Sequence, residues 1–105
     1  MEAAIIITTY PNSRIARKIS KKIIESKLAA CATNLQVNSI YTWKGSLDDC
    51  QEVLVIYKTL VNKVEKLSKK ISQDHPYGIP EIVQIKPSSV SEGYLKWLVE
   101  YLGER

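Results

Sequence analysis

The stretch that decides the fold is residues 30–43, ACATNLQVNSIYTW, with the segments WKGSLDD (43–49) and CQEVLVIYKTL (50–60) that follow it. In the first run, the odd-numbered residues from Cys31 to Trp43 share one face and the even-numbered residues share the other. The run 50–60 alternates in the same way, and a period of two is typical of β-strands. Two such strands joined by a short turn that contains glycine predict a β-hairpin.

Outside the hairpin, the apolar pattern predicts two further strands and three helices. A β-branched apolar run suits a buried strand, and apolar residues three or four positions apart indicate a helix. The expected elements are a strand at 2–9, a helix capped by Asn12 or Ser13 that ends near 27, a helix over 60–71, a short strand at 81–85 and a last helix from about 91. This order predicts an α+β protein, the ferredoxin-like β-α-β-β-α-β arrangement with a C-terminal helix, in a single domain over 1–105.

The predicted hairpin is long for a domain of this size. A strand from Cys31 to Trp43 would extend about 43 Å, whereas a domain of this length has a radius of gyration of about 13 Å. The strand must therefore bend, break at a bulge or project beyond its own core. A projecting hairpin with Tyr41 and Trp43 at its end needs cover, and pairing with identical subunits in a closed ring, a homotrimer, is the expected solution.

Composition excludes several classes of protein. The chain of 105 residues carries a net charge of +4, with its lysines grouped on predicted helices. No RNA- or DNA-binding motif accompanies this charge, so no nucleic-acid partner is expected. No apolar run is long enough to span a membrane, and the start of the chain lacks a basic segment typical of secretion signals. Two cysteines, Cys31 and Cys50, form no CxxC pair, so we expect a reducing, cytoplasmic environment.

The loop DHPYGIPEI, residues 74–82, contains the only histidine of the chain. His75 is a candidate metal ligand, because neutral imidazole is the commonest protein ligand for metals. The alternative is a turn histidine whose ring nitrogens bond nearby backbone groups. The prolines and Gly78 are explained by the shape of the chain alone.

Other candidate residues also have two interpretations. Cys31 is a possible metal ligand or a small buried hydrophobic residue, and Cys50 lies beside two acids and is expected to have no role. Lys58 and Glu81 are a structural pair or part of a cleft beside the histidine. A final group of aromatic residues is expected to pack at a subunit interface or to line a ligand-binding cleft there: Tyr41, Trp43, Tyr77 and Trp97.

Five segments in order resemble the CutA family, the divalent-cation tolerance proteins. They are TTYPN (8–12), LAACATNLQVNSIYTWKG (28–45), VLVIYKT (53–59), HPYGIPEI (75–82) and GYLKWL (93–98). The resemblance implies a ferredoxin-like trimer, similar to the PII signalling proteins, whose long hairpins interlock around a threefold axis. It also implies copper binding through a first-strand cysteine and two adjacent histidines, positions at which this chain has Thr8, Asp74 and His75.

Taken together, the residues and the resemblance predict a non-enzymatic homotrimer that takes part in divalent-cation tolerance. A metal ion such as copper would bind near the subunit interfaces, with His75, Cys31 and Glu81 as the candidate ligands, and no cofactor would be required. The alternative is a PII-like signalling or scaffold module that binds a small molecule in the cleft between subunits. Neither a phosphate-binding loop nor a catalytic triad is evident, so no enzymatic activity is expected.

Overall fold

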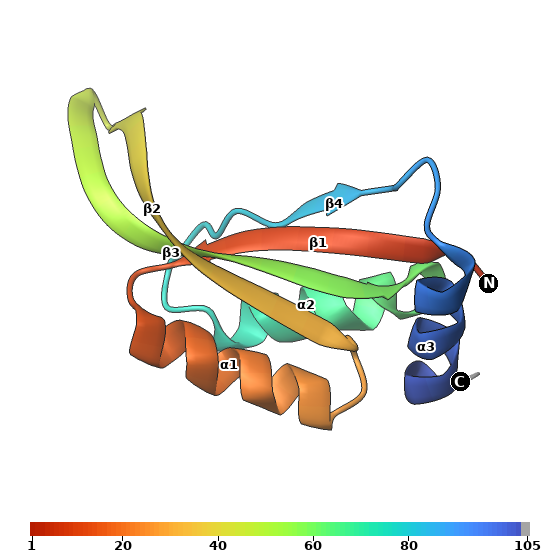
Figure 1. Ribbon diagram of the computed structural model, residues 1–105. Coiled ribbons are helices and arrows are strands. Elements are labelled where there is room, and N and C mark those ends of the chain that lie inside the picture. The colour runs from red at the N-terminus through yellow and green to blue at the C-terminus, as the bar shows by residue number, and fades with distance from the viewer. Residues whose placement is uncertain (104–105) are drawn as a thin grey trace.

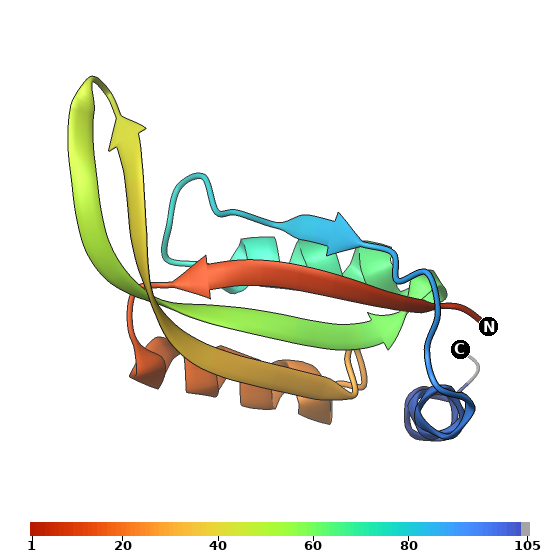
Figure 2. The ribbon, with the colours of Figure 1, turned by 45° about the horizontal axis from the view of Figure 1, so that its top comes forward.

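The computed structural model describes residues 1–103; Glu104 and Arg105, the end of the predicted 1–105 domain, lie outside the described residues. The elements are β1 (Ala3–Tyr10), α1 (Ser13–Glu25), β2 (Cys31–Trp43), β3 (Ser46–Leu60), a 3-10 turn (Val61–Lys63), α2 (Val64–Asp74), β4 (Val83–Ile85) and α3 (Glu92–Leu102). The four strands form one antiparallel sheet in the order β2-β3-β1-β4, and α1 and α2 lie side by side against one of its faces (Figures 1 and 2). The predicted ferredoxin-like α+β fold is confirmed.

The turn of the hairpin is shorter than predicted. Only Lys44 and Gly45 lie between the paired strands, and both have positive φ angles, of 52° and 82°. Two consecutive positive φ angles are typical of a type I′ turn, whose twist matches that of the flanking strands. Pairing therefore continues up to Trp43 and Ser46, and residues 46–49, which we expected in the turn, belong to β3.

Several other predicted boundaries also move. The helix expected at 60–71 begins only at Val64, because Leu60 still pairs with Ala3 in the sheet. The strand expected at 81–85 begins at Val83. The first helix, capped by the Asn12 side chain, ends at Glu25, because Lys27 has a φ of 60° and so lies outside the helical region.

The main core fills the space between the sheet and the two helices. Ile6 and Tyr57 from the strands meet Ile23 of α1 and Leu67 of α2, and all four side chains are fully buried. At the end of the sheet where β1 begins, α3 packs on Leu60 in a second, smaller cluster (Figure 1). The main core thus holds one face of the sheet against α1 and α2.

The other face of the sheet has no covering layer from α1 or α2; we call it the open sheet face. Side chains alternate between the two faces along each strand, so the residues directly before and after a buried strand residue point to the open sheet face. Leu35, Val83 and Ile85 on this face are 43–44% exposed. Its apolar members are Ile5, Ile7, Leu35, Val37, Leu54, Ile56, Val83 and Ile85.

The β2–β3 hairpin extends past the other strands and curves away from the body of the molecule (Figure 2). Its pairing is continuous from Cys31–Lys58 to Trp43–Ser46, so the hairpin contains no bulge. Of the three outcomes expected for the long strand, the structure shows two: the strand bends, and it projects beyond the core. The molecule measures 44 × 26 × 21 Å along its principal axes. The end of the hairpin leaves Ile40, Trp43 and Leu47 between 49% and 72% exposed.

Candidate functional site

His75 follows α2 directly and is held in an extended conformation by the proline that comes after it. His75 is 9% exposed, and its ring stacks on Tyr10, with 4.6 Å between the ring centroids. Nε2 donates to the Thr9 carbonyl oxygen at 2.8 Å, and Nδ1 accepts from the Tyr77 amide at 3.2 Å. Both nitrogens are thus engaged by the backbone, so metal binding by His75 would require one of these hydrogen bonds to break.

The burial of His75 predicts a particular dependence of stability on pH. Burial lowers the pKa of its imidazole, and the hydrogen bond to Thr9 only partly opposes this effect. The unfolded chain therefore takes up the proton more readily, and the contribution of His75 to stability is complete above its ordinary pKa of about 6.5. We expect the melting temperature to fall as the pH is lowered from neutrality through this value.

Differential scanning calorimetry at several pH values between neutrality and the range where carboxylates titrate would measure this effect. The variant His75→Gln has no titrating group in this window and is expected to show a nearly constant melting temperature. An equally constant melting temperature in the wild type would contradict the prediction.

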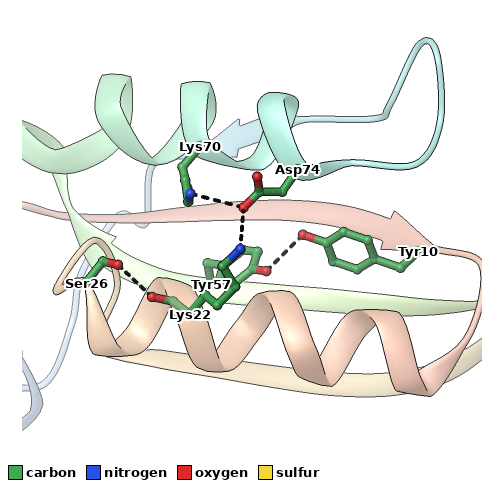
Figure 3. Close-up of polar contacts among 6 residues, drawn as sticks. All are labelled: Tyr10, Lys22, Ser26, Tyr57, Lys70 and Asp74. Carbon is green, nitrogen blue, oxygen red and sulfur yellow. Dashed lines mark hydrogen bonds and ion pairs between the residues drawn. The ribbon is translucent and has the colours of Figure 1, made fainter.

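Thr8 and Asp74, which the resemblance places at the other two copper-ligand positions, both have partners within the chain. Thr8 is fully buried, with its hydroxyl oxygen 3.3 Å from Nε2 of His75. The Asp74 carboxylate lies 3.2 Å from Nζ of Lys70 and 3.6 Å from Nζ of Lys22 (Figure 3). The ion pair with Lys22 joins α2 to α1, whereas the ion pair with Lys70 lies within α2.

Cys31 and Lys58 lie next to each other on β2 and β3, near α3. Nζ of Lys58 is 3.7 Å from Sγ of Cys31 and also donates to the hydroxyl of Thr33. In the register, Lys58 faces Ile5 near the start of β1, whereas Thr9 faces Leu54. Lys58 and Cys31 therefore lie about 13 Å along the strand from the His75 end of the sheet. Among residues 1–103, no group of three or more histidine, cysteine, aspartate and glutamate side chains is close enough to hold a metal ion.

Four of the predicted residues, Tyr41, Trp43, Tyr77 and Glu81, come together around one pocket of about 780 Å³. The pocket lies between the inner side of the hairpin and the loop that joins α2 to β4. Its lining consists of Thr9, Ser39, Ile40, Tyr41, Trp43, Glu52, Pro76, Tyr77, Gly78, Ile79 and Glu81. A cleft of this size, with aromatic walls and a few polar groups, is suited to a small ligand.

Trp97 lies elsewhere, on α3. It is 43% exposed and packs between Tyr94 and Tyr101, with centroid distances of 5.5 and 6.3 Å. The structure thus separates Trp97 from the other aromatic residues that we grouped with it.

Glu52 also lines the pocket, although it was not among the predicted site residues. It is only 7% exposed, and one of its carboxylate oxygens accepts a hydrogen bond of 2.7 Å from the Tyr77 hydroxyl. Burial and this hydrogen bond raise the pKa of Tyr77, so the phenol stays protonated and donates. A signal was present in the sequence: Glu52 shares its strand face with Leu54 and Ile56, so an acid occurs in an otherwise apolar row.

The sheet order, the two helices on one face and the projecting hairpin define a ferredoxin-like α+β protein with an open sheet face. Residues 4–101 match the model of the family described as CutA1 divalent ion tolerance protein. The chain belongs to this family of divalent-cation tolerance proteins, which is named for ion tolerance and not for a catalytic activity.

Relatives and solved structures agree with this assignment. The chain is 38% identical to the divalent-cation tolerance protein CutA of Pyrococcus horikoshii, covering 91% of this chain and 94% of that one. It is 38% identical to the Thermus thermophilus protein of the same name, over 94% and 97% of the two chains. A crystal structure of CutA1 from Ehrlichia chaffeensis superimposes with a TM-score of 0.93 at 29% identity, over 98% and 97% of the chains.

Within residues 1–103, none of the helices has both the length and the apolar character needed to cross a membrane. One similar structure, from Archaeoglobus fulgidus, is described as a periplasmic divalent cation tolerance protein; it is 28% identical, covers 96% of this chain and 99% of its own, and superimposes with a TM-score of 0.93. The cytoplasmic location expected from the cysteines stays a prediction.

Proposed function

We propose that the protein is a non-enzymatic homotrimer that acts in divalent-cation tolerance, with ions such as copper bound at or near the interfaces between subunits. The observation that carries the proposal is the open sheet face. Its apolar side chains have no layer from α1 or α2 over them, and exposed apolar patches of this kind mark sites of protein–protein contact.

The hairpin supports the same arrangement. Its outer edge, on β2, has unpaired backbone groups, and its end exposes Ile40, Trp43 and Leu47. Edges of this kind associate with other chains unless they are covered. A ring of three copies would cover the hairpin of each subunit and bury the open sheet faces together.

Sedimentation equilibrium at micromolar concentration tests the trimer directly. The expected mass is three times the 11.9 kDa of one chain. A mass of one chain under these conditions would contradict the proposal.

Metal binding would have to use ligands from more than one subunit, because no sufficient cluster exists within residues 1–103. Cys31, His75 and Glu81 are the candidate ligands. Sharing them across an interface would supply the three or four ligands that copper and zinc require.

Isothermal titration calorimetry with Cu²⁺ and with Zn²⁺ tests this part of the proposal. We expect the variants Cys31→Ser, Glu81→Gln and His75→Ala each to bind at least about tenfold more weakly than the wild type, the loss typical when a metal ligand or its immediate support is removed. Cys50→Ser is the matched control, because it removes the other free thiol of the chain. Equal heats in the wild type and in all three variants would exclude these residues as ligands.

A second function, favoured by the pocket beside the hairpin, is a PII-like signalling or scaffold module that binds a small molecule. The pocket is lined by both the projecting hairpin and the loop after α2, so a ligand in it would contact both segments. Such a ligand would raise the melting temperature of the protein by mass action.

A further inference from the structure

The pocket beside the hairpin has a chemical character that differs from that of the whole protein. The chain has a net charge of +4, yet the pocket is lined by two carboxylates, Glu52 and Glu81, and by no lysine or arginine. We propose that this pocket binds a small organic cation, an ammonium group carried on an apolar body, between Glu52 and the rings of Tyr41, Trp43 and Tyr77.

The first support for this ligand class is the state of Glu52. Its side chain is more than nine-tenths buried, and only its Oε2 atom has a hydrogen-bond partner among residues 1–103, the hydroxyl of Tyr77. Neither Glu52 nor Glu81 forms an ion pair with any of these residues. The Glu52 carboxylate is therefore available to a positive group that enters the pocket, where residues 1–103 place no lysine or arginine.

The second support is the aromatic wall. Tyrosine and tryptophan rings attract cations through the negative potential of their faces, and three such rings around an acid form the kind of site that binds ammonium groups. The ring of Trp43 already attracts a cation, because Nζ of Lys44 lies 5.9 Å from its centroid. Tyr77 contributes in a second way, since its hydroxyl orients the Glu52 carboxylate.

The same features argue against other ligand classes. An anion would meet two carboxylates and no base. A bare metal ion would find only two ligands with charged oxygens, fewer than hard cations usually take, and its hydration shell would face Ile40 and Ile79. An organic cation would pair with the Glu52 carboxylate through its charge and would pack on the aromatic rings through its methyl or methylene groups.

This inference rests on the second of the two proposed functions, and one protomer provides the entire lining of the pocket. Sedimentation therefore tests the first proposed function, and ligand binding tests this inference. A trimer that binds no organic cation would leave the first function intact, and a monomer that binds one would leave this inference intact.

Tryptophan fluorescence provides the test. In the full chain with Trp97→Phe, Trp43 is the only tryptophan and reports on the pocket. Choline is the probe, and 3,3-dimethylbutan-1-ol, in which carbon replaces the charged nitrogen, is its neutral counterpart. We expect saturable quenching of Trp43 by choline, protection of Trp43 from acrylamide in its presence, and no effect of the neutral alcohol at the same concentration.

Substitutions identify the group that recognises the charge. Glu52→Gln keeps the shape of the side chain and its ability to accept from Tyr77, and it is expected to weaken choline binding at least about tenfold. Glu100→Gln, which removes an exposed acid from α3, is the matched control and should leave binding unchanged.

Three results would overturn the proposal. The first is equal binding of choline and its neutral counterpart. The second is unchanged choline binding in Glu52→Gln. The third is a Trp43 that acrylamide cannot reach even without choline and that choline does not affect, because a second copy of the chain would then fill the pocket.

Discussion

Replacing Leu35 by aspartate is expected to convert the proposed trimer into single chains. Leu35 lies on the open sheet face in the middle of β2, opposite Leu54 of β3, and is 43% exposed in the isolated protomer. A carboxylate at this position stays hydrated in a monomer but would be buried without a partner between subunits, at a cost of several kcal/mol for each copy. Since every 1.4 kcal/mol changes an equilibrium constant about tenfold, three such losses are enough to prevent assembly at micromolar concentration.

Sedimentation equilibrium of Leu35→Asp should give the 11.9 kDa of one chain, and circular dichroism should show that the chain is still folded. Ser72→Asp adds the same charge to the exposed surface of α2 and is expected to leave the trimer intact. If Leu35→Asp sediments as a trimer, the open sheet face is not the surface through which the subunits associate.

The second large effect concerns the core. Leu67 of α2 is fully buried in the cluster that joins the helices to the sheet. Truncation to alanine removes three carbon atoms and leaves a cavity that the neighbouring strands cannot fill, so Leu67→Ala is expected to lower the free energy of unfolding by about 2–5 kcal/mol.

Chemical denaturation at a single protein concentration measures this loss, and the concentration must be held constant because assembly contributes to apparent stability. Leu67→Met conserves the volume of the side chain and should cost less than about 1.5 kcal/mol. Similar midpoints for the alanine and methionine variants would mean that the core can close around a smaller residue.

The fold could be predicted because its signals are local. Alternation in residues 30–43 assigned the even-numbered side chains of β2 to one face, and that face does meet α1: Nδ2 of Asn34 lies 3.5 Å from the hydroxyl of Ser20, and Nε2 of Gln36 lies 3.5 Å from that of Ser13. The hairpin turn was predicted at the correct position but too long. The residues that follow Gly45 are mostly polar, so their alternation is weak and does not mark them clearly as part of the strand.

The site depends on contacts that no local pattern encodes. Glu52 and Tyr77 are 25 positions apart in the sequence, and the acid gave only the weak signal of a charge in an apolar row. The two interpretations of His75, ligand or turn residue, could not be separated without its distant partner, because the carbonyl that its Nε2 binds belongs to Thr9, 66 positions away.

The strands are attached to the sheet very unequally. Thirteen residue pairs connect β2 to β3, whereas only three, at Ile5–Ile85, Ile6–Gln84 and Ile7–Val83, connect β4 to β1. Segments with few backbone bonds open locally at low free energy, long before the whole domain unfolds. Since residues 76–81 belong to the segment that ends in β4, transient release of this short strand would loosen one wall of the pocket and give a ligand a way in while the rest of the sheet stays closed.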